Sequence, residues 1–156
     1  MLKITIRQAN TGEVRTLQNL FDEIFVDDVK YDDDLRTDWA QSEDGGKKYF
    51  TDLLNNGNAI CLFAEADCKV IGFVTASHLE DRYRKSKYIE IGYLGVIPEY
   101  HSKGIGKILM DECIRIAKNR GFQKVYLNSY FRNTKAIDFY KRNGFLEIDV
   151  SLEKKI

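Results

Sequence analysis

The sequence is poor in the residues that bind metals or form disulfide bonds. Its 156 residues include three cysteines and two histidines, and no pair of cysteines has the C-x-x-C spacing of a zinc site. An odd number of cysteines also argues against a disulfide framework. We therefore expect reduced thiols, no bound metal and a cytoplasmic location.

Net charge and long apolar segments are lacking as well. Lys and Arg number 24, as do Asp and Glu, so the chain has no overall attraction to nucleic acid or to an anionic membrane surface. No apolar run approaches the roughly 20 residues of a membrane helix. The N-terminal segment MLKITIRQAN alternates apolar and polar residues and lacks the apolar stretch of a signal peptide. The sequence therefore predicts neither nucleic acid nor a membrane as a partner.

The chain contains one proline and has no internal repeat or Pro/Gly-rich linker. At this length we expect residues 1–156 to form one domain with its own core. Period-two alternation predicts strands, and apolar residues three and four apart predict helices. The predicted strands are 3–7, 59–66, 69–79, 87–97, 124–130 and 145–154, and the predicted helices are 13–26, 47–54, 104–120 and 134–143.

This order, β-α-α-β-β-β-α-β-α-β, predicts an α/β fold with a mixed central sheet. The fourth and fifth strands should be parallel, because a helix joins them through a right-handed crossover. Residues 67–69 are expected to form a hairpin turn, and the charged segment 81–87 a loop. Asn133 is placed to cap the start of the last helix, while Gly121 and Gly144 are placed to end helices.

The segment HSKGIGK, residues 101–107, puts two glycines at the start of a predicted helix. A helix N-terminus carries unpaired N–H groups that suit an anion, and glycine lets phosphate oxygens approach them closely. Lys103 and Lys107 add positive charge. The pattern favours a pyrophosphate cradle, and the alternative is a purely structural turn. The P-loop pattern G-x-x-x-x-G-K-[ST] is absent. The dinucleotide fingerprint G-x-G-x-x-G fails because Leu109 stands in place of its third glycine.

Two longer runs resemble the signatures of the GNAT superfamily of acetyl-CoA-dependent N-acetyltransferases. LGVIPEYHSKGIGKILM is similar to its L-x-V-x-P…Q/R-x-x-G-x-G/A signature, and NTKAIDFYKRNGF to N-x-x-A-x-x-F-Y-x-x-x-G-F. The order and separation of the two runs also match. The resemblance implies acetyl transfer from acetyl-CoA to a primary amine by direct attack, in a sheet whose fourth and fifth strands splay apart. It implies acetyl-CoA as co-substrate, with no metal, and is compatible with a homodimer.

The resemblance also implies which residues bind the cofactor. Main-chain groups of Leu94, Gly95 and Val96 would pair with the pantetheine arm, and an N–H near Val96 would face the thioester oxygen. The phosphate cradle would consist of His101, Ser102, Lys103, Gly104, Ile105, Gly106 and Lys107, with a further cofactor contact from Asn133. A histidine stands where the family has Gln or Arg, so affinity is expected to be weaker or more dependent on pH.

Two residues are candidates for proton transfer. Tyr140 matches the tyrosine that protonates the departing thiolate; its position alone favours a core aromatic. Glu90 aligns with a glutamate that some members use as base, and strand alternation would put it on the same face as Gly92, Leu94 and Val96. A solvated or salt-bridged carboxylate is the alternative for Glu90. On the next strand, Asn128 cannot accept a proton at neutral pH.

The acceptor would lie near residues 27–39, the segment least similar to the family. From Asp22 to Asp38, eight acidic residues accompany two basic ones, and Tyr31 and Trp39 lie among them. Acidic and aromatic walls would suit a cationic amine such as a polyamine, an aminoglycoside or a lysine side chain. The alternative is a solvated acidic loop. The rival function is a non-catalytic acyl-CoA-binding module, which would have no use for the Tyr140 phenol.

Overall fold

The computed structural model describes residues 2–80 and 84–156, so the first residues of the predicted loop at 81–87 lie outside the described chain. The strands in the described residues form one mixed sheet in the order β1-β2-β3-β4-β5. They are β1 (Thr5–Gln8), β2 (Ile60–Ala66), β3 (Lys69–Leu79), β4 (Tyr88–Val96) and β5 (Lys124–Tyr126). Only β4 and β5 are parallel, which confirms the predicted α/β fold and its crossover.

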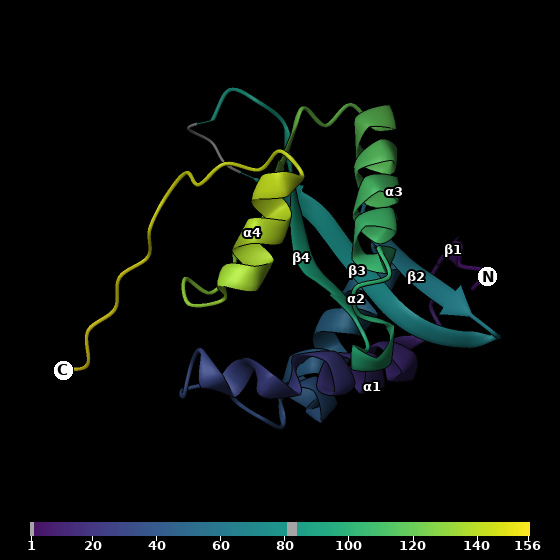
Figure 1. The fold of residues 1–156 in the computed structure, drawn as a ribbon, viewed down its shortest axis with the longest axis horizontal. Helices are drawn as coiled ribbons and strands as arrows, with labels where there is room; N and C mark the ends of the chain where they lie inside the picture. The colour runs from purple at the N-terminus through teal and green to yellow at the C-terminus, as the bar shows by residue number, and fades with distance from the viewer. Residues whose placement is uncertain (1, 81–83) are drawn as a thin grey trace.

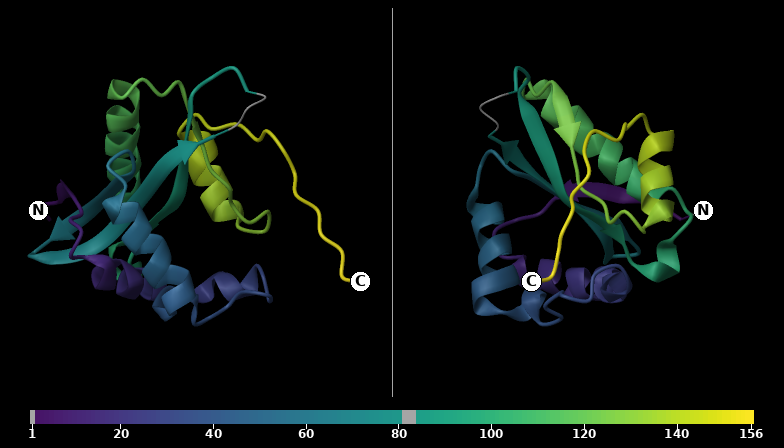
Figure 2. Two further views of the ribbon diagram at one scale, coloured as in Figure 1. Left: turned by 180° about the vertical axis from the view of Figure 1, so that it is seen from behind. Right: turned by 90° about the vertical axis from the view of Figure 1, so that its left-hand side faces the viewer.

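Helices cover both faces of this sheet (Figure 1, Figure 2). The α-helices are α1 (Val14–Phe25), α2 (Lys48–Asn55), α3 (Ile105–Asn119) and α4 (Thr134–Arg142); shorter helical turns are η1 (Val26–Lys30), η2 (Trp39–Gln41), η3 (Glu43–Lys47) and η4 (Pro98–Tyr100). Figure 2 shows α1 and α2 on one face, with α3 and α4 on the other. Within the described chain, none of these helices is both long and apolar enough to cross a membrane.

The chain reversals follow the local sequence. The β2–β3 hairpin turns through Asp67 (φ 49°) and Cys68 (φ 62°), both left-handed, as a type I′ turn requires. Helix α3 ends at Gly121 (φ 81°), and the Phe122 N–H bonds to the Ala117 C=O at 3.1 Å. Helix α4 ends in the same way at Gly144, with a 3.1 Å bond from Phe145 to Tyr140. Both endings are Schellman motifs, which confirms the glycine caps.

The connector between α1 and α2, residues 26–47, is held against α1. Gln18 is buried at 4% exposure, and its Nε2 donates to the Ala40 C=O at 2.8 Å. Nearby, a Cβ on Gly46 would lie 2.3 Å from the Ala40 oxygen, so only glycine allows this approach. The acidic connector is therefore a fixed wall.

A β-bulge changes which side chains of β4 share a face. Thr75 pairs with Tyr93 and the next residue, Ala76, pairs with Ile91, so Gly92 is the extra residue. Tyr93 then contacts Phe21 of α1, at 5.0 Å between ring centroids. A Cβ on Gly95 would also meet α1, at 2.4 Å from Ile24.

Alternation after the bulge points Leu94 and Val96 to the opposite face. A Cβ on Gly92 would lie 2.7 Å from the Tyr49 hydroxyl of α2, so Glu90, two residues earlier, shares the α1/α2 face. Of the predicted common face, Glu90 and Gly92 do lie together, and the prediction is wrong for Leu94 and Val96. The bulge inserts one residue, and one residue reverses the alternation.

Two predicted strands are shorter or missing. The strand expected at 124–130 ends at Tyr126, and the strand expected at 145–154 does not form. The C-terminal segment, residues 145–156, instead leaves α4 and runs away from the sheet (Figure 1). Its alternation is that of a strand, but a strand needs a neighbour to satisfy its backbone, and the described chain provides none there.

Candidate active site

The parallel ladder between β4 and β5 ends early. Residues 88–90 of β4 pair with residues 124–126 of β5, but β4 continues to Val96, paired only with β3 in the described residues. The strands therefore separate, which opens a gap beside Leu94, Gly95 and Val96. This is the splay that the predicted cofactor position needs.

The direction of the backbone groups on β4 follows from two hydrogen bonds. The Tyr93 N–H donates to Thr75 Oγ1 at 3.0 Å, and the Ile97 N–H donates to the Ile71 C=O at 2.8 Å, so both point towards β3. Successive residues of a strand point their N–H groups to opposite edges. The N–H groups of Leu94 and Val96 therefore face the gap.

His101 is engaged with the end of the same strand. Its Nε2 lies 2.7 Å from the Val96 C=O, and because a carbonyl only accepts, Nε2 carries the proton and donates. The imidazole thus ties the start of the glycine loop to β4. Its contact with a phosphate, expected from its position in the sequence, stays a prediction.

The loop before α3 has the geometry of an anion-binding turn. Ser102 (φ 61°) and Gly104 (φ 77°) are left-handed, and turns with such residues aim successive N–H groups into one concavity. Gly104 precedes α3 without a side-chain cap, and the first intrahelical bond here joins the Ile108 N–H to the Gly104 C=O at 3.1 Å. The N–H groups of Ile105, Gly106 and Lys107 therefore remain for a ligand.

The two lysines of this loop already have local partners. The Lys103 ammonium lies 4.7 Å from the Tyr100 ring centroid and 3.2 Å from the Glu99 C=O. Lys107 forms an i,i+4 ion pair with Asp111. Both side chains are at the surface, where such contacts contribute little and are easily exchanged. The backbone is thus the fixed part of the cradle.

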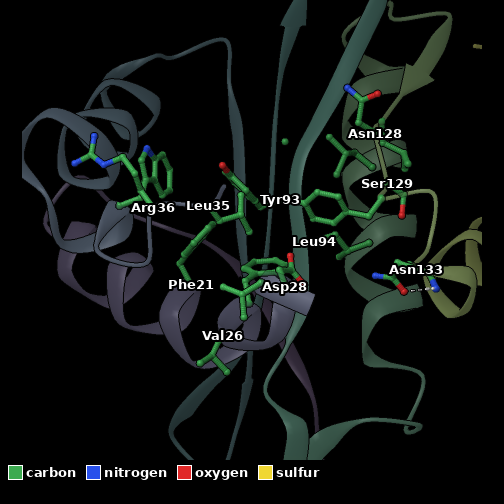
Figure 3. Close-up of a pocket in the computed structure, with 18 of the residues that line it drawn as sticks. Phe21, Val26, Asp28, Leu35, Arg36, Tyr93, Leu94, Asn128, Ser129 and Asn133 are labelled. Atoms are coloured by element: carbon green, nitrogen blue, oxygen red, sulfur yellow. Dashed lines mark hydrogen bonds between the residues drawn. The ribbon is translucent and has the colours of Figure 1, made fainter. Parts of the chain in front are cut away.

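A cavity of about 890 Å³ lies between the connector and the segment that follows β5. In Figure 3, Leu35 and Arg36 of the connector face Asn128, Ser129 and Asn133 across it. Its lining residues are Phe21, Asp22, Phe25, Val26, Asp28, Val29, Asp34, Leu35, Arg36, Thr37, Trp39, Ile91, Gly92, Tyr93, Leu94, Leu127, Asn128, Ser129, Tyr130, Asn133, Ala136, Tyr140 and Ser151. The structure thus brings together three predicted site residues, Leu94, Asn133 and Tyr140, whereas Glu90 is not among the residues that line the cavity.

Tyr140 reaches this cavity from α4. Its ring packs against Phe139 and Phe145, with centroids 5.2 and 5.6 Å away. Burial raises the pKa of its phenol to about 12. The group therefore stays protonated at neutral pH and can donate a proton. Asn133 caps the same helix, as predicted, by accepting from the Ala136 N–H at 3.2 Å.

Glu90 is half-buried on β4, beside the cavity and on the α1/α2 face. Burial raises the pKa of its carboxyl. The pKa of the neighbouring Tyr49 phenol is raised mainly by burial, and the charge of the Glu90 carboxylate raises it further. Between Glu90 and the cavity lies the bulge at Gly92, where a Cβ would meet the Tyr49 hydroxyl at 2.7 Å and Thr75 Oγ1 at 3.2 Å.

The connector supplies an acidic and aromatic wall. Asp22, Asp28 and Asp34 line the cavity with one cation, Arg36, which pairs with Asp44 at 3.3 Å and Asp38 at 3.5 Å. Burial raises the pKa of the Asp28 carboxyl, and the neighbouring Asp27 adds to this, while the charge of Lys30 acts in the opposite direction. The cavity is therefore negative.

The sequence predicted an acidic and aromatic wall near residues 27–39, but it did not predict several aromatic residues that lie there. Tyr93 could have been found from its place beside Leu94 on the splayed strand. Nothing in the sequence indicated Tyr130, which stacks on Tyr31 at 5.7 Å between centroids while Arg132 donates to the Tyr31 C=O at 2.5 Å. These contacts, across about a hundred residues of sequence, join the connector to the segment after β5.

The cysteines do not contribute a nucleophile to this site. Cys61 and Cys113 are buried, and burial raises the pKa of each thiol to about 12, so neither is a thiolate at neutral pH. Among the residues described, no group of three or more His, Cys, Asp or Glu side chains is placed to hold a metal ion.

Comparison with known proteins gives one consistent family. A model of the acetyltransferase (GNAT) family matches residues 15–145. An uncharacterized N-acetyltransferase of Methanocaldococcus jannaschii is 34% identical over 103 residues, 65% of this chain but only 46% of that relative. A spermidine N(1)-acetyltransferase of Thermoplasma acidophilum is 27% identical over 118 residues, which cover 74% of this chain and 70% of that one.

The fold is shared with solved structures. The aminoglycoside N-acetyltransferase AAC(6')-Iy in complex with CoA superposes with a TM-score of 0.75 at 18% identity, over 100% of this chain and 96% of the other. A sequence identity of 18% supports a shared fold and nothing more specific.

Gly106 offers a clean test of the cradle. A Cβ there would lie 3.9 Å from Phe139 and the backbone is ordinary helix, so Gly106→Val should fold. The added side chain would cover the N–H groups of the first turn, and we expect affinity for acetyl-CoA, measured by calorimetry, to fall at least about tenfold, or 1.4 kcal/mol. Gly57→Val, in an open loop, is the matched control. Binding within a few-fold of wild type would overturn the cradle.

Proposed function

The chain belongs to the acetyltransferase (GNAT) family, and from that premise we propose that residues 1–156 form one N-acetyltransferase domain acting on a small cationic amine. One observation carries the proposal. A single cavity joins the open edge of β4 and the Tyr140 phenol to a wall rich in carboxylates and aromatic rings. A thioester bound along β4 and an ammonium drawn to the acidic wall would then meet.

Acetyl-CoA supplies the activated acetyl group as co-substrate. Its pyrophosphate would occupy the turn at 101–107, and its pantetheine arm would pair with the free edge of β4. We assign the oxyanion contact to the Leu94 N–H, because Leu94 lines the cavity and Val96 does not. This revises the donor expected near Val96. Val96 also has its C=O occupied by His101.

The Tyr140 phenol would protonate the departing thiolate. A pKa of about 12 keeps the proton on the phenol at rest. Burial raises the basicity of a thiolate in the same site as well, so the two groups remain matched for transfer. The fully buried thiols at Cys61 and Cys113 give no support to an acyl-enzyme route, so the amine would attack the thioester directly.

The amine must lose a proton before it attacks, because an ammonium has no lone pair. Glu90 would accept that proton through water, since the residue lies next to the cavity but does not line it. Its raised pKa makes it a stronger base than a free glutamate, while leaving it ionised above that pKa. In this proposal, the attack on the thioester and the transfer of the amine's proton would occur on opposite sides of Gly92.

The acceptor is assigned to a small polyamine-like cation. Three carboxylates and the rings of Phe21, Phe25 and Trp39 line the cavity, and such walls stabilise an ammonium by charge and by cation–π contact. A spermidine N(1)-acetyltransferase is among the relatives, which agrees with this choice. A non-catalytic binding module would need neither the phenol nor the acidic wall.

The assignment is tested by an amine screen with thiol detection of released CoA. Spermidine, an aminoglycoside and a lysine-containing peptide are compared, and we expect spermidine to have the highest kcat/KM. Asp28→Asn should then lower that kcat/KM roughly tenfold, through KM, by removing one partly buried charge. Asp33→Asn, at an exposed position outside the cavity lining, should change little. If no amine released CoA although acetyl-CoA bound, the binding module would be favoured.

Tyr140→Phe removes the proposed acid and keeps the ring. We expect unchanged affinity for acetyl-CoA and a kcat lower by roughly 10²-fold, the lower range for general acid catalysis. Tyr88→Phe is the control, a buried tyrosine whose hydroxyl accepts from Arg84 away from the cavity. An unchanged kcat in Tyr140→Phe would make Tyr140 a packing residue.

Glu90→Gln keeps the size of the side chain and removes its basicity. In the wild type, kcat/KM should rise with pH through a pKa above the usual glutamate range, because burial favours the neutral acid. The variant should lose roughly 10²-fold at neutral pH and less as free amine becomes abundant near the amine's own pKa. Glu23→Gln, exposed on α1, is the control. An equal loss at every pH would indicate positioning, and a wild-type profile would exclude Glu90 as the base.

A further inference from the structure

Thr75 is a buried polar residue in the middle of β3. It is 0% exposed, and Gln18 is the other polar residue that is buried among those described. A buried hydroxyl loses its hydrogen bonds to water, so it is stable only where protein groups replace them. Thr75 lies opposite Tyr93 of β4, and the register of the two strands shifts directly after it, between Thr75 and Ala76. The hydroxyl is therefore located at the bulge.

The Thr75 hydroxyl accepts a hydrogen bond from the bulged strand. The Tyr93 N–H donates to Thr75 Oγ1 at 3.0 Å, and Tyr93 follows the extra residue, Gly92. A bulge interrupts the regular ladder, so a buried N–H beside it needs an acceptor that the ladder does not guarantee. A side chain of β3 thus fixes the direction of a backbone group of β4.

A second hydroxyl approaches the bulge from α2. A Cβ on Gly92 would lie 2.7 Å from the Tyr49 hydroxyl and 3.2 Å from Thr75 Oγ1, so both oxygens flank the same position of β4. Burial raises the pKa of the Tyr49 phenol, and a hydrogen bond with Thr75 acts in the opposite direction. The Tyr49 ring also packs edge-on against Tyr93, at 5.6 Å between centroids. Two elements, β3 and α2, therefore hold the extra residue in place.

The bulge decides which backbone groups of β4 face the cavity. Successive residues of a strand point their N–H groups to opposite edges, so a Tyr93 N–H fixed towards β3 leaves the Leu94 N–H at the gap. A pairing without the extra residue would reverse this order. The exact position matters for an oxyanion donor, because a misplacement of about 1 Å can cost roughly 10²-fold in rate.

We propose that Thr75 is a positioning residue for acetyl transfer: together with Tyr49, its hydroxyl holds the bulge at Gly92 so that the Leu94 N–H faces the thioester oxygen. This rests on the proposed function, in which Leu94 supplies the oxyanion contact. Thr75 is not among the residues that line the cavity, so it acts on the reaction through the backbone of β4.

Thr75→Val removes the hydroxyl and nearly keeps the size of the side chain. The Tyr93 N–H then lacks its acceptor, so we expect its hydrogen exchange, followed by NMR, to be at least about tenfold faster. With the screened amine of highest kcat/KM, kcat should fall roughly tenfold. Affinity for acetyl-CoA should stay within a few-fold of wild type, because the cradle lies at the start of α3. Thr75→Ser keeps an acceptor and should restore both kcat and slow exchange. Thr5→Val, the same change at an exposed position of β1, is the control.

Gly92→Ala tests the second hydroxyl. The added Cβ would meet the Tyr49 oxygen at 2.7 Å, so we expect kcat to fall roughly tenfold. Tyr49→Phe in the same chain removes that oxygen and should recover part of the loss, which a double-mutant cycle measures. Gly57→Ala, in an open loop, should leave kcat unchanged. A loss in Gly92→Ala that Tyr49→Phe does not reduce would contradict the role of Tyr49.

The exchange measurement separates this proposal from the proposed function, because it needs no turnover. A Tyr93 amide that stays equally protected in Thr75→Val would overturn the proposal, whatever the activity. A wild-type kcat in Thr75→Val, or a loss that Thr75→Ser does not restore, would overturn it as well. A wild-type protein that released no CoA with any amine would contradict the proposed function instead.

Discussion

The early separation of β4 from β5 is the constraint on which the rest of the site depends. Three residue pairs join the strands, and beyond Glu90 the two chains diverge. A complete ladder would have occupied the backbone of Leu94 and Val96. Because it stops, those N–H groups face an open gap, and the space between the strands becomes the cavity that Tyr140 and Asn133 enter from α4.

The opposite wall of the cavity is the acidic connector, residues 26–47, and its position depends on a few contacts. Gln18 bonds the Ala40 C=O, and the Tyr31–Tyr130 stack joins the connector to the chain after β5. Arg36, the cation at the cavity, is neutralised by Asp38 and Asp44. The carboxylates of Asp22, Asp28 and Asp34 therefore keep a negative potential inside a protein with no net charge.

Gly92 connects the two halves of the proposed chemistry. The bulge there reverses the alternation of β4, which points Leu94 to the α3/α4 face and leaves Glu90 on the α1/α2 face. One inserted residue thus separates the proposed base from the proposed oxyanion donor. The same strand holds the Val96 C=O through His101, so the cradle and the strand end are coupled in position.

Local sequence determined much of this protein. The spacing of apolar residues predicted the α/β order and the parallel crossover, and the capping residues predicted the Asn133 cap and the glycine helix ends. Each of these features depends on neighbours within a few residues. The cradle and the role of Tyr140 were predicted from the resemblance of the two runs to the family signatures, and these remain predictions. Only the tertiary structure decided the bulge at Gly92, the acids that line the cavity and the engagement of His101. The strand pattern at 145–154 also failed as a prediction, since pairing depends on a distant edge and not on the residues that would pair.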